Sequence, residues 1–203
     1  RTGRTNLVVF ADYYTKWVEA FPTENITAET IANLFVNEIV LRHGEPRFLL
    51  SDQGSNFTSK LMQEVCELLE IRKLRTTAYH PRCDGLVERF NQTILKQLQR
   101  LAKDDLENWE RYLPFVLFAY RATPHESTKE TPFFLMYGRQ PKFGLDNVLF
   151  RKMNFDQDYD SYRFYISNTL METRKTILEN IEKAQLKQKL FCCKKKKKKN
   201  FSN

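Results

Sequence analysis

Two carboxylates, Asp52 and Glu88, stand with thirty-five residues between them in local sequences suited to holding a divalent cation. Asp52 follows the short apolar run 48–51 and precedes a turn sequence, which predicts a position at the tip of a strand. Glu88 follows a segment with Pro81 and Gly85 and begins a long stretch of helical periodicity. Mg²⁺ prefers sparse oxygen ligands of this kind, completed by water or phosphate oxygens. The alternative is a solvated strand-end acid and an acid that favours the helix dipole.

The sequence motifs around these two acids indicate a protein family more specifically than the two acids do by themselves. Asp52 lies in the block SDQGSNF (51–57), and Glu88 lies in AYHPRCDGLVERFN (78–91). Two further blocks are VVFADYYTKW (8–17) and TPFFLMYGR (131–139). In this order and at these spacings, the four blocks resemble the integrase catalytic core of LTR retrotransposons and retroviruses, with the closest likeness to the gypsy type. The resemblance covers residues 5–143.

The resemblance implies an α/β fold of the RNase H-like type, in which a mixed sheet is flanked by helices. It also implies that the core cuts and joins DNA with Mg²⁺ or Mn²⁺ held by three carboxylates. Asp52 and Glu88 match the second and third of these, so both are expected to be catalytic residues and metal ligands.

The first carboxylate of that triad is where this sequence departs from the family. From the residues alone, Asp12 is the obvious candidate, because it ends the apolar run Leu7–Ala11. In integrases that resemble this chain, however, the first catalytic Asp lies on an earlier strand, and Asp12 corresponds to a position that is not a ligand. No Asp or Glu precedes Asp12. We therefore expect an N-terminally truncated core that is inactive as it stands, with Asp12 in a turn or structural role.

Composition and charge bound the remaining possibilities. A chain of 203 residues with 41% hydrophobic content can bury a core, which excludes a disordered protein. The formal net charge is +8, but Lys194–Lys199 supply six positive charges, so the rest carries 27 Lys and Arg against 25 Asp and Glu, or +2. A DNA-binding surface must therefore come from local clusters of basic residues rather than from bulk charge.

The four cysteines and the apolar runs restrict the cellular environment. The cysteines form no CxxC pair and no zinc-finger spacing with the three histidines, which fits a reducing compartment without a disulfide framework. There is no apolar run near 18 residues and no signal-peptide pattern. We expect no membrane partner, and a location in the nucleus after assembly in the cytoplasm.

Strands and helices alternate in the part of the chain that must position the two acids, which predicts a mixed sheet with helices packed on it. Strands are expected at Leu7–Ala11, at Trp17–Phe21, in the run ending at Asp52 and at Lys73–Tyr79. Thr27 is a good N-cap for a helix through about Arg42, and Thr58 or Ser59 for a second helix through Leu69.

The helix that begins at Glu88 has two distinct faces. The stripe expected to face the sheet consists of Val87, Asn91, Ile94, Leu98 and Leu101. The second face is polar and partly basic, and consists of Glu88, Gln92, Lys96, Gln99 and Lys103. We expect substrate DNA along this second face, with phosphates contacted by Lys96, Arg89, Arg100 and Lys103. An ordinary solvated face is the alternative for each single residue.

The remaining segments predict assembly and extensions. Trp109–Tyr120 is apolar on nearly every side, so it is either buried core or part of a homo-oligomer interface. Residues 1–143 are expected to form the integrase core (first strand missing), 144–190 a helical connector and 191–203 a lysine-rich low-complexity tail. The lysine run can bind DNA or direct nuclear import, or else it reflects translation of an adenine-rich stretch after a frameshift or a premature end.

Three functions fit these observations. The first is DNA integration by a retrotransposon integrase core, a polynucleotidyl transferase that performs 3′-end processing and strand transfer. The second is a non-catalytic remnant or a domesticated module that binds DNA or itself. The third, another RNase H-like nuclease, is the weakest, because the four blocks match integrases in particular. The first two differ by one feature, the upstream Asp.

Overall fold

A computed structural model describes residues 3–52, 54–75, 85–103, 105–142 and 171–187, together with Phe164, Ser167 and Asn168. The chain divides into two compact units. The first unit is Arg1–Tyr13 with Val18–Phe118, and the second is Tyr14–Trp17 with Ala119–Asn203. Asp52 and Glu88 both belong to the first unit.

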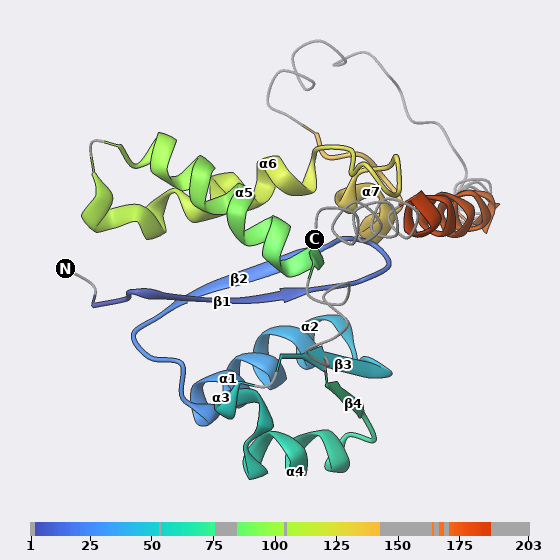
Figure 1. Ribbon diagram of the computed structural model, residues 1–203. Coiled ribbons are helices and arrows are strands. Elements are labelled where there is room, and N and C mark those ends of the chain that lie inside the picture. The colour runs from blue at the N-terminus through green and yellow to red at the C-terminus, as the bar shows by residue number, and fades with distance from the viewer. Residues whose placement is uncertain are drawn as a thin grey trace, which may run out of the picture. The chain divides into compact units, whose positions relative to one another are not determined.

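The described elements alternate in the expected order (Figure 1). The strands are β1 (Asn6–Ala11), β2 (Val18–Thr23), β3 (Phe48–Ser51) and β4 (Arg72–Arg75). The helices are α1 (Ala28–Leu34), the π-helix η1 (Phe35–Val40), α2 (Leu41–His43), α3 (Ser55–Thr58), α4 (Lys60–Leu68), α5 (Gly85–Leu101), the 3₁₀-helix η2 (Leu106–Arg111), α6 (Leu113–Arg121) and α7 (Pro132–Tyr137).

The four strands pair in two separate sheets within the first unit. β1 and β2 are antiparallel, with Val9 opposite Ala20, whereas β3 and β4 are parallel, with Leu50 opposite Leu74. The expected mixture of parallel and antiparallel strands is therefore present, but among the described residues it is divided between two two-stranded sheets. β4 covers only the first part of the predicted strand Lys73–Tyr79, because residues 76–79 lie outside the described part of the chain.

The first predicted helix has the expected ends but a different interior. The side chain of Thr27 accepts a hydrogen bond from the Thr30 backbone N–H at 3.2 Å, as an N-cap does. The helix stops at Gly44, whose φ of 87° lies in the left-handed region that favours glycine. Between these ends the chain forms the π-helix η1, a wider turn that the apolar periodicity did not predict.

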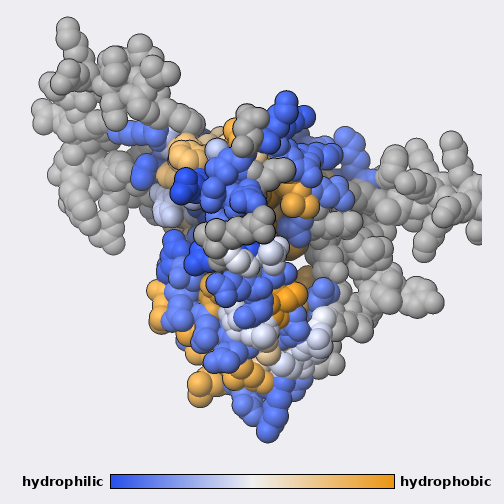
Figure 2. Space-filling model, turned by 90° about the vertical axis from the view of Figure 1, so that its left-hand side faces the viewer, coloured by the Kyte–Doolittle hydropathy of each residue, from blue (hydrophilic) through white to orange (hydrophobic). Residues whose placement is uncertain are grey.

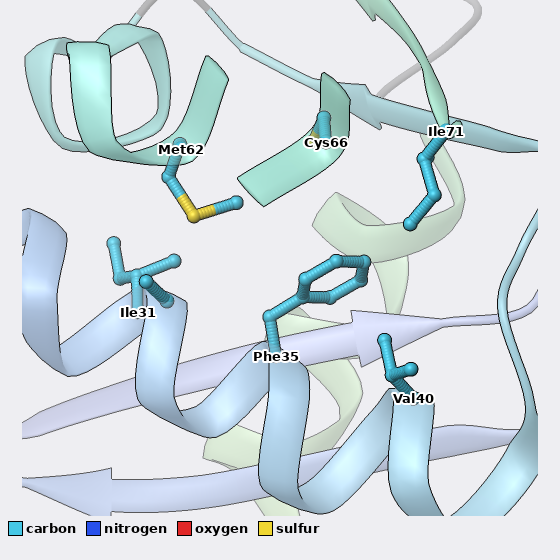
Figure 3. Close-up of a cluster of buried hydrophobic side chains, with 7 residues drawn as sticks. Ile31, Phe35, Val40, Met62, Cys66 and Ile71 are labelled. Atoms are coloured by element: carbon cyan, nitrogen blue, oxygen red, sulfur yellow. The ribbon is translucent and has the colours of Figure 1, made fainter. Parts of the chain in front are cut away.

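The core of the first unit joins β1, α1, η1, β3, α3 and α4, together with Ile71, the residue before β4. Its centre contains side chains that are at most 9% exposed, and Figure 3 shows most of them: Ile31, Ala32, Phe35, Val40, Met62, Cys66 and Ile71. Phe10 of β1 and Leu49 of β3 pack against this cluster. Burial raises the pKa of the Cys66 thiol, although the nearby Lys73 ammonium acts in the opposite direction. The thiol is therefore protonated at neutral pH and packs as a small apolar group.

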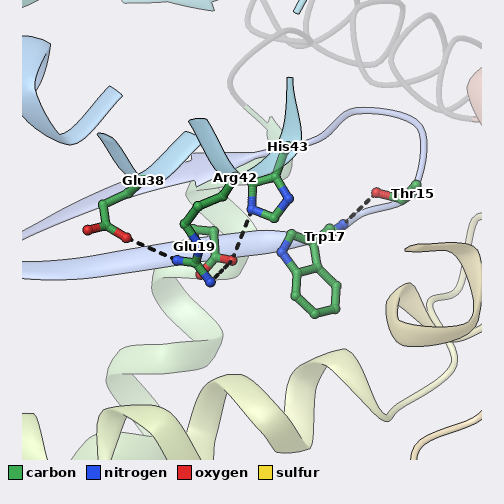
Figure 4. A network of polar contacts seen from close by, with 6 residues as sticks. All are labelled: Thr15, Trp17, Glu19, Glu38, Arg42 and His43. Carbon is green, nitrogen blue, oxygen red and sulfur yellow. Dashed lines mark hydrogen bonds and ion pairs between the residues drawn. The ribbon is translucent and has the colours of Figure 1, made fainter. Parts of the chain in front are cut away.

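Polar contacts connect Glu19 of β2 to Arg42 and His43 of α2. The carboxylate of Glu19, whose side chain is 7% exposed, lies 3.3 Å from Nε2 of His43 and 3.8 Å from Nη2 of Arg42. Arg42 also pairs with Glu38 at 3.0 Å (Figure 4). A buried carboxylate requires such partners because desolvation of an isolated charge is costly.

α6, the helix in the segment for which core and interface were the alternatives, is only partly buried. Leu113, Val116 and Leu117 are buried, whereas Phe115 is 70% exposed and Phe118 is 39% exposed. One side of this helix is therefore core, and the other presents aromatic side chains. On one face of the molecule, such apolar residues stand as separate patches on a mainly hydrophilic surface (Figure 2).

The C-terminal extension is described only in part. Residues 171–187 are helical, and Ile177 and Ile181 are buried. The rest of the predicted connector, apart from three residues, and the lysine tail lie outside the described part of the chain. No helix among the described residues is long and apolar enough to cross a membrane.

The central position of Phe35 predicts a large effect of its removal. Phe35→Ala should lower the free energy of unfolding by about 3–5 kcal/mol, because it deletes a buried ring and leaves a cavity. Urea denaturation of both variants measures this, with Leu41→Ala as the control, since Leu41 is 73% exposed. Equal losses for the two variants would show that Phe35 does not organise this core.

Candidate metal and DNA site

Asp52 lies directly after β3, at the strand tip predicted from the sequence, and its side chain is exposed. Its Oδ1 atom accepts a hydrogen bond from the Gly54 backbone N–H at 3.0 Å. No described residue gives Oδ2 a hydrogen-bond partner. The backbone therefore fixes one oxygen of an exposed carboxylate.

The loop after Asp52 is anchored on both sides. The Gly54 carbonyl accepts hydrogen bonds from the N–H groups of Phe57 and Thr58, each at 3.0 Å, which begins α3. Lys73 of β4 donates to the Phe57 carbonyl. Ser51, the residue before Asp52, is buried. These contacts connect the strand end, α3 and β4, so the carboxylate stands on a fixed support.

Glu88 is the fourth residue of α5, in the first turn of a seventeen-residue helix. The backbone there is described, whereas the side chain lies outside the described part of the chain. Phe90, Ile94 and Leu98 are 2%, 0% and 6% exposed, and they fix the helix against its neighbours. α5 contacts β1. In Figure 1, α5 lies on one side of β1, and α1 with its buried cluster lies on the other side.

The predicted buried stripe of α5 is wrong at one residue. Leu101 is 52% exposed, because it is the last residue of the helix and Ala102 takes the buried position after it. Phe90, which the prediction left out, belongs to the buried face. Phe90 stands four residues before Ile94, and this helical spacing could have predicted that the two share the buried face.

The polar face of α5 is exposed at its described residues, which leave out the Glu88 side chain. Gln92, Lys96 and Gln99 are exposed, as are Arg89, Arg100 and Lys103. Lys103 lies two residues beyond the end of α5. These basic side chains form the local positive cluster that the nearly neutral body of the chain requires, and their contact with DNA stays a prediction.

Asp12 lies one residue after β1. Among the described residues, no three or more His, Cys, Asp or Glu side chains come together in a way that could hold a metal ion. Asp52 and Glu88 have the oxygen chemistry that Mg²⁺ or Mn²⁺ prefers. The carboxylate oxygens of these two residues therefore suit such an ion. A third carboxylate beside them is lacking in the part of the chain that is described.

The sequence of this chain is similar to parts of viral polyproteins. Residues 1–81 match the integrase core domain. The chain is 38% identical over 140 residues to the Gag-Pol polyproteins of baboon endogenous virus (strain M7) and feline leukemia virus, which covers 68% of this chain and 8% of each polyprotein. The same identity over 140 residues relates it to the Pol polyprotein of radiation murine leukemia virus (strain Kaplan), of which 24% is covered.

Solved structures of similar fold are integrase cores. The HTLV-2 integrase catalytic core domain in complex with magnesium has a TM-score of 0.54 at 22% identity, covering 64% of this chain and 84% of that one. The BIV integrase core has a TM-score of 0.54 at 25% identity, covering 65% and 85%. The simian T-cell lymphotropic virus intasome gives 0.58 at 22% identity, covering 68% and 51%. The predicted resemblance and RNase H-like fold are confirmed.

The hydrogen bond at Asp52 predicts how the loop tolerates loss of charge. Asp52→Asn should change the free energy of unfolding by less than about 0.5 kcal/mol, because the amide oxygen still accepts from Gly54 and the site is exposed. Asp52→Ala removes that acceptor and should cost about 0.5–1.5 kcal/mol. Thermal and urea unfolding measure both. A large loss of stability in Asp52→Asn would show that the negative charge itself contributes to folding.

Proposed function

We propose that this chain, which carries an integrase core domain, is the catalytic core of a DNA integrase of the retrotransposon or retroviral type. Its reaction would be metal-dependent 3′-end processing and DNA strand transfer. One observation carries the proposal: the acids of the two signature blocks lie at the end of β3 and in the first turn of α5. The fold that positions them is that of solved integrase cores.

The residues that would hold the metal are Asp52, through its Oδ2, and Glu88. When bound, Mg²⁺ or Mn²⁺ supplies activation of a water or a DNA 3′-hydroxyl and stabilisation of the leaving oxygen. Asp52 contributes a carboxylate that is already oriented by the Gly54 N–H. Glu88 contributes a second carboxylate on a helix fixed by its buried face.

A third carboxylate would come from a strand placed between β1 and β3. In the described part of the chain, β1 pairs only with β2 and β3 only with β4, so each has one open edge. Phe10 of β1 and Leu49 of β3 nevertheless pack against the same core. Two-stranded sheets are marginally stable alone. An added strand would join them into one sheet and place an Asp beside Asp52, as the family resemblance implies.

DNA and a second copy of the chain are the proposed partners. Lys96, Arg89, Arg100 and Lys103 would contact phosphates, because they form an exposed basic cluster that continues from Glu88 along α5. The exposed Phe115 and Phe118 of α6 support self-association. Related core domains have been solved in trimeric and dimeric forms. The reaction on DNA would take place in the nucleus.

A non-catalytic DNA-binding or self-associating module is the second candidate. This candidate retains the basic cluster of α5 and the aromatic residues of α6, and differs in having no reaction. Activity measurements separate the two candidates.

The catalytic proposal predicts a requirement for the third carboxylate. The chain alone should show no strand transfer on short duplex DNA with Mn²⁺, and a preceding strand that carries an Asp should be necessary for any activity. In a chain extended by that strand, Asp52→Asn and Glu88→Gln should reduce activity to background, because each removes a metal ligand, and Asp12→Asn should not. Loss of activity in a folded Asp12→Asn variant would assign Asp12 to the metal instead.

The charge distribution predicts a separation of DNA affinity between tail and core. Deleting Lys194–Asn203 should remove most non-specific affinity and flatten the salt dependence, since each phosphate contact contributes about 0.9 to the log–log slope. In the tailless chain, Lys96→Ala should reduce the log–log slope by about a further 0.9, the contribution of one phosphate contact. Lys60→Ala is the matched control, since Lys60 is exposed on α4 and pairs with Glu64. Equal slopes for both lysine variants would exclude α5 as the DNA surface.

A further inference from the structure

Gly54 does not need to be glycine for the sake of its backbone. Its φ and ψ are −54° and 135°, values that any residue adopts. What distinguishes the position is space. A Cβ atom at residue 54 would lie 3.0 Å from Oδ1 of Asp52 and 3.5 Å from Cδ2 of Phe57. The first distance is shorter than ordinary van der Waals contact, so one of the two groups would have to move.

The backbone at residue 54 is the less movable of the two. Its carbonyl accepts hydrogen bonds from the N–H groups of Phe57 and Thr58, both at 3.0 Å, and the Thr58 hydroxyl donates to the same oxygen at 3.2 Å. The Asp52 side chain is exposed, and among the described residues only the Gly54 N–H, at 3.0 Å, holds it. A side chain at residue 54 would therefore push the carboxylate out of its position by a few tenths of an ångström.

We propose that Gly54 is a positioning residue for the metal ligand Asp52. Its N–H fixes Oδ1, and its missing side chain leaves room for the carboxylate in that orientation. Oδ2 alone is then presented to a cation, so that Asp52 is a monodentate ligand. This inference rests on the proposed function, because it assigns a metal-binding purpose to a contact that would otherwise serve only the loop.

A purely structural role for the contact predicts a different pattern of effects. If Asp52 only closes the turn before α3, substitution of Gly54 would alter stability and leave cation binding unchanged. If the contact orients a ligand, substitution would weaken cation binding at nearly unchanged stability. Asp52→Asn separates these roles, because it keeps the acceptor oxygen and removes the charge.

The test is titration of the full chain with Mn²⁺, followed by electron paramagnetic resonance. The wild-type chain should bind weakly, through a site lost in Asp52→Asn. Gly54→Ala should raise the Kd about tenfold, which corresponds to ~1.4 kcal/mol, the scale of a hydrogen bond to a charged group. Ser55→Ala is the matched control and should stay within about twofold, since the Ser55 hydroxyl contacts Asn56 and not Asp52.

A second readout requires no metal. In amide NMR spectra, with each shift corrected for residue type, the residue-54 N–H should keep its hydrogen-bonded chemical shift in Asp52→Asn and move away from it in Gly54→Ala and Gly54→Ser. A shift retained in the two Gly54 variants overturns the inference. Mn²⁺ binding that depends on Asp52 but is equal in wild type and Gly54→Ala also overturns it, and leaves the proposed function standing. Wild-type Mn²⁺ binding that is unaffected by Asp52→Asn contradicts the proposed function itself.

Discussion

The buried cluster around Phe35 is the constraint on which the candidate site depends. α1, η1 and α4 supply most of its side chains, and Ile71 supplies the one next to β4. Leu49 packs against it from β3, so the same apolar contacts that bury Phe35 also hold the strand whose end carries Asp52. The acid itself is exposed, and its position is determined by residues that take no part in the chemistry. This is how a rigid scaffold supports a reactive loop residue.

Local chemistry made much of this arrangement predictable from the sequence. Thr27 and Ser59 cap their helices through hydrogen bonds to nearby N–H groups, and such contacts depend on only a few neighbouring residues. Asp52 and Glu88 were placed correctly at a strand end and a helix start for the same reason. Their family-like blocks then gave these positions a chemical meaning that strand and helix periodicity could not provide.

Features that depend on distant contacts were predicted less well. The π-helix η1 lies in the middle of an apolar stripe, where packing rather than local propensity determines the number of residues per turn. Leu101 has the right spacing for burial, but α5 ends there and Ala102 fills the position. The division of four strands into two sheets could not be read from the strands themselves, because strand pairing is set by tertiary partners. The significance of Gly54 likewise required the distance to Asp52.

The central claim is that Asp52 and Glu88 hold the same divalent ion. Diffraction from crystals of the chain soaked in Mn²⁺, measured at a wavelength where manganese scatters anomalously, locates the ion directly. We expect an anomalous peak within about 2.0–2.6 Å of Asp52 Oδ2, with the Glu88 carboxylate on the other side of the ion. A peak beside Asp12 instead, or well-ordered Asp52 and Glu88 carboxylates with no peak between them, would contradict the claim.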